Sequence, residues 1–321
     1  MNLKQKLYQM FIVGTEGEGY KTALKNNLGG MIFFTHDIHS LEQFKNLIRE
    51  IKKISLTPPF LSIDQEGGRV ERTENIHNGK KYLSAKFAFE KGEDFLRNQT
   101  KEIALELKSF GINLNFAPCI DVNTNPNNPI IGERAFSDNA EDVIRGEKIV
   151  SQTYRENGII PCAKHYPGHG DADADSHLTL PKIDLPLAEM EKMHIKPFKA
   201  CAKNIEMIMV AHLHCTCFEK DPVPASLSKN AISYLREEFD GVLISDDMVM
   251  KGVSDIENAC EKGIRAGLNL FIYRHSKPEL FEMIDNIAKK AEHDTELKTN
   301  IEKSFEKIMR LKRRFILNTS A

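Results

Sequence analysis

The stretch "IPCAKHYPG", residues 160–168, begins as an apolar run and ends in charged and polar side chains. A short run rich in apolar residues is typical of a buried parallel strand. Lys164 and His165 come at the end of this run, and both are costly to bury without partners. The pattern therefore indicates a strand whose last residues face a polar site.

Similar runs recur along the whole chain, separated by longer amphipathic segments. They cover residues 10–14, 30–34, 61–65, 114–122, 160–168, 205–212, 242–248 and 268–273. Eight alternations of strand and helix favour a (β/α)8 TIM barrel over a doubly wound sheet. Because no Pro/Gly/Ser-rich linker interrupts the pattern, we predict one α/β domain over residues 1–321, closed by a C-terminal helix.

Capping residues predict where several of the helices begin and end. Ser40 precedes the amphipathic segment 41–54 and is a good N-cap. Gly111 and Gly158 follow two other amphipathic segments and are typical of helix C-termini.

Composition excludes several classes of protein. The chain has 321 residues with a net charge of -2 and no basic stripe, so we expect no nucleic-acid partner. It lacks an apolar stretch of about 18 residues, so we expect no membrane partner. The first twenty residues lack a secretory apolar region, which favours a cytoplasmic location. Six cysteines occur without a CxxC pair, and we interpret them as reduced and structural.

Polar residues gather where the predicted strands end, and barrel enzymes act at that rim. "DQEGGR" (64–69) follows the third run, "HLHC" (212–215) the sixth and "SDD" (245–247) the seventh. Adjacent strand residues point to opposite faces, so only one residue of the pair Asp246–Asp247 faces the barrel axis. If Ile244 points inward, so does Asp246, which is then a candidate nucleophile or metal ligand. Alternatively, either Asp caps the helix that follows.

The segment "KHYPGHGDADADSH" (164–177) carries a second candidate group. The spacing of Asp175 and His177 allows a hydrogen bond that fixes the imidazole tautomer and raises its basicity. Such a histidine can donate a proton to a leaving group and then take one from water. The alternative is a solvated loop in which Asp175 caps a helix.

Other strand-end residues suit a ligand with several hydroxyl groups. Asp64 can accept sugar hydroxyls, and Arg72 offers a fork of donors. Lys164 and His165 need polar partners. Arg134 follows another strand, and the alternative to a sugar-binding role for it is a surface salt bridge. The chain has no Trp, which favours a small sugar in a pocket over an extended polysaccharide.

Four motifs, in this order, resemble those of glycoside hydrolase family 3. They are "DQEGGRVER" (64–72), "GERAFSDN" (132–139), "KHYPGHGDADADSH" (164–177) and "GVLISDDMVM" (241–250). The set is most similar to the short, single-domain bacterial β-N-acetylglucosaminidases of that family. The resemblance implies a cytoplasmic enzyme of cell-wall recycling, without a metal or other cofactor. Its substrates would be N-acetylglucosaminyl-1,6-anhydro-N-acetylmuramic acid and the corresponding peptides, and we expect a monomer.

The resemblance also implies a role for each candidate residue. Asp246 would be the nucleophile of a retaining mechanism with a covalent glycosyl-enzyme, and His177 with Asp175 the acid/base pair. The residues that hold the sugar would be Asp64, Arg72, Arg134, Lys164 and His165.

Three other readings stay open at this point. One is a metal-dependent barrel hydrolase with His165, His169, Asp171 and Asp246 as ligands. Another is a catalytically silent barrel that binds a sugar or a partner. Within the same family, a β-glucosidase or a phosphorylase is the third, because the residues do not reveal an acetamido pocket and an imidazole does not repel phosphate.

Overall fold

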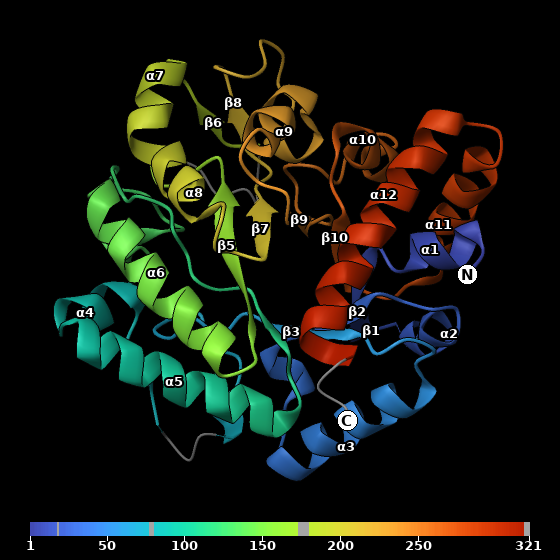
Figure 1. Cartoon of the computed structure of the whole chain (residues 1–321), viewed down its shortest axis with the longest axis horizontal. Helices are drawn as coiled ribbons and strands as arrows, with labels where there is room; N and C mark the ends of the chain where they lie inside the picture. The colour runs from blue at the N-terminus through green and yellow to red at the C-terminus, as the bar shows by residue number, and fades with distance from the viewer. Residues whose placement is uncertain (18, 77–79, 173–179, 318–321) are drawn as a thin grey trace.

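A closed barrel of parallel strands forms the centre of the computed structural model, which describes residues 1–17, 19–76, 80–172 and 180–317 (Figure 1). Around the barrel the strands are β1 (Phe11–Glu16), β2 (Gly30–Phe33), β3 (Phe60–Ile63), β4 (Leu114–Asn115), β5 (Ile160–Tyr166), β7 (Met207–Val210), β9 (Val242–Asp247) and β10 (Leu270–His275). Strands β1 and β10 pair and close the ring. Each predicted run overlaps one barrel strand, so the predicted TIM barrel is confirmed.

Helices surround the barrel, and most of them lie between successive strands of the chain (Figure 1). They are α1 (Leu3–Tyr8), α2 (Tyr20–Lys25), α3 (Leu41–Ile54), α4 (Ala85–Glu90), α5 (Glu93–Phe110), α6 (Ala140–Glu156), α7 (Leu187–Met190), α8 (Lys196–Cys201), α9 (Lys229–Arg236), α10 (Ala259–Ala266), α11 (Pro278–Ala291) and α12 (Thr295–Lys312). Two short strands outside the barrel, β6 (Lys182–Ile183) and β8 (His214–Cys215), pair with each other.

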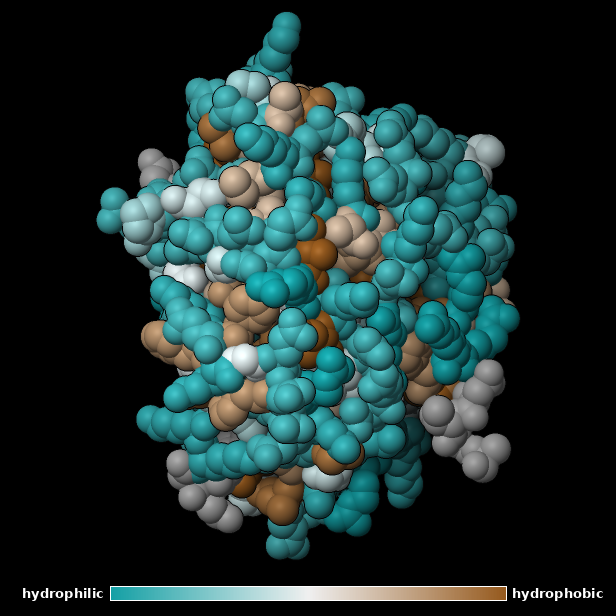
Figure 2. Space-filling model, turned by 60° about the vertical axis from the view of Figure 1, so that its left-hand side comes forward, coloured by the Kyte–Doolittle hydropathy of each residue, from teal (hydrophilic) through white to brown (hydrophobic). Residues whose placement is uncertain are grey.

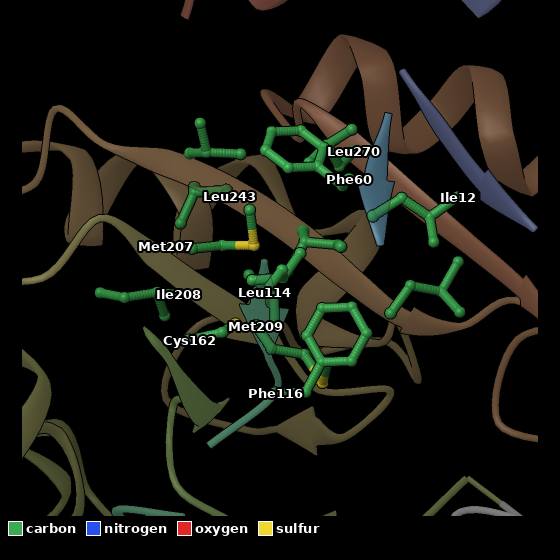
Figure 3. Close-up of a cluster of buried hydrophobic side chains, with 14 of the residues drawn as sticks. Ile12, Phe60, Leu114, Phe116, Cys162, Met207, Ile208, Met209, Leu243 and Leu270 are labelled. Carbon is green, nitrogen blue, oxygen red and sulfur yellow. The ribbon is translucent and has the colours of Figure 1, made fainter. Parts of the chain in front are cut away.

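Apolar side chains from different strands pack together in the core (Figure 3). Ile12, Phe60, Leu114, Met207 and Leu270 come from five strands, and each is fully buried. Burying one such side chain contributes about 1.5–3 kcal/mol. The barrel is therefore held by a packed interior, which leaves the strand ends free to carry polar groups.

The predicted helix ends agree with the structure. The Ser40 hydroxyl accepts a hydrogen bond from the Gln43 N–H at 3.2 Å. Gly111 and Gly158 follow α5 and α6 with φ values of 93° and 79°, a region that favours glycine. On the face shown in Figure 2, hydrophobic residues form separate spots within a mainly hydrophilic surface.

The end of α12 is fixed to the start of the barrel by a buried lysine. Lys312 is fully buried, and its Nζ donates to the Gln9 side chain at 2.8 Å and to the Gly29 carbonyl at 2.7 Å. Gln9 precedes β1 and Gly29 precedes β2. The last long helix thus closes the structure at the N-terminal end of the strands, opposite the predicted site.

All six cysteines lie in the described ranges and are free, and five of them are buried. Within those ranges, no helix combines the length and the apolar character needed to cross a membrane.

Glu147 is a buried carboxyl group outside the predicted site. It lies on α6 with 4% of its surface exposed, and burial raises its pKa to about 7, although Ser151 and Arg155 oppose the shift. The unfolded chain has a pKa of about 4.3 at this position, so the folded state binds the extra proton between these two values. Stability therefore falls as the pH rises from about 4.3 to 7 and stays reduced above pH 7.

We expect Glu147→Gln to stabilise the protein at pH 8.5, by up to about 3 kcal/mol, because the amide does not ionise. At pH 4.5 the two proteins should differ little. Urea unfolding at both pH values measures this difference. Equal gains at both values would show that ionisation of Glu147 is not the cause.

Candidate active site

The ends of β3 and β5 meet through a buried lysine. Lys164 lies in β5 with 2% of its side chain exposed, and its Nζ donates to an Asp64 carboxylate oxygen at 2.8 Å. Asp64 directly follows β3 and is also 3.9 Å from the Arg72 guanidinium, which lies over the Phe34 ring. Burial lowers the pKa of Lys164, but Asp64 and Glu66 outweigh this effect and raise it. Lys164 is therefore a permanent cation in this site.

Glu66 connects two of the predicted sugar-holding residues. Its carboxylate accepts two hydrogen bonds from Arg134, each 2.9 Å long, and also pairs with Lys164. The Glu66 side chain is only 5% exposed. Burial raises its pKa, yet Arg134 and Lys164 more than compensate and hold it well below the ordinary value. Paired charges of this kind can remain ionised in a buried site.

Asp121 holds the histidine that follows Lys164. Its carboxylate accepts from His165 Nδ1 at 2.7 Å and from the backbone N–H of His169 at 2.6 Å. His165 Nε2 faces the other way and lies 3.4 Å from Arg134 Nη2. The peptide bond between Lys164 and His165 is cis. The five predicted sugar-holding residues thus lie in one contact network, joined by Glu66 and anchored by Asp121.

Asp246 and Asp247 end β9 and have different surroundings. Asp247 pairs with Arg274 of β10 and accepts the Val249 N–H at 3.2 Å, so it fixes the loop backbone. Asp246 remains partly exposed. Burial raises the pKa of Asp246, but the electrostatic attraction of His165, His212 and Lys164, together with the hydrogen bond from the Asp247 N–H, outweighs it, and the net shift is downward. Asp246 is therefore an ionised carboxylate near neutral pH.

His212, which follows β7, is a fully buried neighbour of Asp246. Its Nδ1 contacts the Ser226 hydroxyl at 2.7 Å, whereas its Nε2 has no hydrogen-bond partner among the residues that the structure describes. Burial lowers the pKa of His212. A neutral, rigidly held ring therefore lies beside the carboxylate that we predict to be the nucleophile.

The chain that leaves β5 is tied to the segment that follows β4. Asn128 donates to the carbonyls of His169 at 2.8 Å and Ala172 at 2.9 Å, and Thr124 donates to Asp171 at 2.9 Å. Gly170 packs so tightly here that a Cβ atom would lie 1.7 Å from the Val122 carbonyl oxygen. The described start of this loop is therefore held in place.

Asp175 and His177, the predicted acid/base pair, lie outside the residues that the structure describes. Their roles stay predictions.

The metal ligands of the rival reading are not gathered in one place. Within the described part of the chain, the group whose ligand atoms lie close enough to hold an ion is Cys119, Asp121 and His165. These atoms already contact one another, with the Cys119 thiol 3.3 Å from the Asp121 carboxylate. His169 and Asp246 do not belong to this group, and Asp171 binds Thr124 instead.

Sequence reasoning did not assign Glu66, Asp121 or His212. Glu66 directly follows an apolar run, and Asp121 and His212 lie at the ends of two others, so the strand-end signal that selected Asp64 and Lys164 applied to them as well. Their partners lie on other strands, and the sequence does not show which polar groups meet.

A barrel whose strand ends combine an ionised carboxylate with a buried cluster of charged side chains suits a glycoside hydrolase. The family model described as "Glycosyl hydrolase family 3 N terminal domain" matches residues 2–311. The chain belongs to glycosyl hydrolase family 3, as the four motifs predicted, and it is a glycoside hydrolase.

Several relatives are named β-hexosaminidases. A protein named "Beta-hexosaminidase" from Idiomarina loihiensis is 30% identical over 288 residues, which are 85% of each protein. "Beta-hexosaminidase A" from Pseudoalteromonas piscicida is 32% identical over 262 residues, or 74% of this chain. The match spans only 44% of that longer relative.

Solved structures agree with this assignment. A glycoside hydrolase family 3 β-N-acetylglucosaminidase from Paenibacillus sp. str. FPU-7 superposes with a TM-score of 0.93 at 29% identity. The superposition covers all of this chain and 64% of that protein, so the chain spans less than two thirds of this relative.

We expect Glu66→Gln to destabilise the protein by about 3 kcal/mol or more, because it leaves Lys164 and Arg134 buried without a full counter-charge. Urea unfolding measures the change. Asp255→Asn is the control, since it removes a carboxylate from an exposed ion pair with Lys251 and should have little effect. A Glu66→Gln protein as stable as this control would show that the buried charge is not required.

Proposed function

We propose that the protein is a retaining exo-β-N-acetylglucosaminidase. The observation that carries the proposal is the position of Asp246 relative to Asp64 and the residues that contact it, Lys164 and Arg72. Strands β9 and β3 are four places apart in either direction around the barrel, so they lie on opposite sides. A single sugar ring between them would present its anomeric carbon to Asp246 and its non-reducing end to Asp64, Lys164 and Arg72.

This arrangement favours removal of terminal sugars. The non-reducing end would meet a network of buried charges, which would favour a terminal sugar over a longer glycan on that side. Polar groups that are already paired and held lose little entropy on binding, so they suit recognition of several hydroxyls at once. Family membership and the relatives named β-hexosaminidase support N-acetylglucosamine as the sugar.

The reaction would proceed in two steps through a covalent intermediate. Asp246 attacks the anomeric carbon while His177, oriented by Asp175, donates a proton to the departing glycosidic oxygen. His177 then removes a proton from water, whose oxygen attacks the same carbon and releases the carboxylate. Each step inverts the configuration at the anomeric carbon, so the released sugar keeps the β configuration of the substrate. Asp246, ionised near neutral pH, suits the first step.

We propose wall fragments as the natural substrates, namely N-acetylglucosaminyl-1,6-anhydro-N-acetylmuramic acid and its peptides. The resemblance of the four motifs to bacterial enzymes of cell-wall recycling supports this choice. A cytoplasmic location suits the six free cysteines, since thiols persist in reducing compartments. We propose that the enzyme acts as a monomer, without nucleic-acid or membrane partners.

Substrate choice is tested by comparing 4-nitrophenyl β-N-acetylglucosaminide with 4-nitrophenyl β-glucoside, each with and without phosphate. We expect hydrolysis of the first, little reaction of the second and no sugar phosphate. NMR should show β-N-acetylglucosamine as the first product. Faster turnover of the glucoside, or formation of a sugar 1-phosphate, would favour a β-glucosidase or a phosphorylase.

We expect Asp246→Ala to lower kcat at least about a thousandfold, because it removes the nucleophile. His177→Ala should lower kcat/KM about 10²–10⁴-fold for the 1,6-anhydromuramic acid disaccharide, which needs a proton on its leaving oxygen. The same variant should affect the 2,4-dinitrophenyl glycoside far less. Equal losses for both leaving groups would rule out His177 as the acid.

A further inference from the structure

The hydrogen bonds around Asp121 define where His165 carries its proton. Asp121 is fully buried, and its oxygens accept from His165 Nδ1 at 2.7 Å and from the backbone N–H groups of His165 and His169 at 3.2 and 2.6 Å. Burial raises the pKa of Asp121, but these histidines outweigh it and hold the pKa well below the ordinary value. An ionised carboxylate can only accept, so Nδ1 must be the donor.

The other ring nitrogen faces a group with the opposite chemistry. Arg134 Nη2 lies 3.4 Å from His165 Nε2, and a guanidinium carries only donors. The contact is favourable only if Nε2 has a free lone pair. A doubly protonated ring would place an N–H against a permanent cation. Asp121 thus requires a proton on Nδ1, Arg134 disfavours one on Nε2, and the two contacts together favour the neutral Nδ1–H tautomer.

The lone pair on Nε2 remains open to a better partner. Its separation from Arg134 is long compared with the usual N–H···O or N–H···N distance of about 2.9 Å. Arg134 already donates twice to Glu66 and once to the Ile130 carbonyl at 3.2 Å. A hydroxyl group that reaches Nε2 can therefore form the stronger bond without leaving Arg134 unpaired.

We propose that Asp121 is a positioning residue that holds His165 as the neutral Nδ1–H tautomer, so that Nε2 accepts a hydrogen bond from one hydroxyl of the bound sugar. This proposal rests on the proposed function. Lys164, the preceding residue, can only donate. Of these two neighbouring side chains, Lys164 would therefore donate a hydrogen bond to a sugar oxygen, whereas His165 would accept one from a sugar hydroxyl.

Nitrogen NMR of ¹⁵N-histidine-labelled protein tests the tautomer directly. His165 is assigned by comparison with His165→Gln, and spectra are recorded with and without N-acetylglucosamine. We expect a protonated Nδ1 and an unprotonated Nε2 in both states. A proton on Nε2, alone or together with Nδ1, would overturn the proposal. A residue that merely stabilised the fold would not fix this signature.

Sugar analogues test the accepting role in the wild-type protein. Inhibition constants are measured for N-acetylglucosamine and for its deoxy and deoxyfluoro analogues at carbons 3, 4 and 6. At one position, both analogues should bind about tenfold more weakly, because neither can donate to Nε2. Where the sugar hydroxyl only accepts a hydrogen bond from the protein, the deoxyfluoro analogue should retain part of the affinity that the deoxy analogue loses. If fluorine restores affinity at all three positions, Nε2 is not an acceptor.

Two variants connect this preference to Asp121. Asp121→Asn can turn its NH₂ group toward Nδ1 and favour the other tautomer, so the ¹⁵N signature should change and the affinity for N-acetylglucosamine should fall about tenfold. Cys119→Ala is the matched control, since its thiol contacts the same carboxylate but does not hold the imidazole. An unchanged signature in Asp121→Asn would contradict the positioning role.

These results separate the two proposals. Hydrolysis of the N-acetylglucosaminide together with an Nε2–H ring would leave the proposed function intact and overturn only the inference about Asp121. Absence of that hydrolysis in the wild-type protein would overturn the proposed function, whatever the tautomer.

Discussion

Buried charge is the constraint on which the site depends. Lys164 and Arg134 are 2% and 9% exposed, and each positive charge is costly to bury at such depth without a counter-charge. Glu66 supplies that charge to both, and Asp64 completes the pairing of Lys164. Because these residues come from the ends of β3 and β5 and from the segment after β4, satisfying their charges also fixes the three segments relative to one another. The geometry that would receive a sugar is thus set before any sugar binds.

The fold could be predicted because its signals are local. Each barrel strand is a short apolar run, and the packed interior requires such runs wherever the strands lie. Helix ends could be predicted for the same reason, since the Ser40 hydroxyl and the left-handed Gly111 each cap a helix turn that is adjacent in sequence. Eight local patterns were enough to define the architecture, and the polar ends of the runs indicated which rim carries the site.

The site could be predicted only in part, because its partners are distant in sequence. The resemblance and the strand ends selected Asp64 and Lys164, but only the structure shows that they touch, 100 residues apart. Glu66 and Asp121 were overlooked for the same reason: a carboxylate at a strand end gives no sign of which cation or imidazole it meets. The metal reading grouped residues by type, whereas the structure pairs Asp171 with Thr124. Asp175 and His177 lie outside the described residues, so the prediction of their acid/base role rests on the sequence alone.

The closure of the barrel has a consequence for biosynthesis. Strand β1 pairs with β10, and Lys312 near the end of the chain binds Gln9 near its start. A ribosome that has made the first half of the protein exposes only an open set of strands with unpaired edges. The ring can close only once residues 270–275 have left the exit tunnel. Until then the edges of the strands already made stay unpaired, which leaves the nascent chain prone to aggregation.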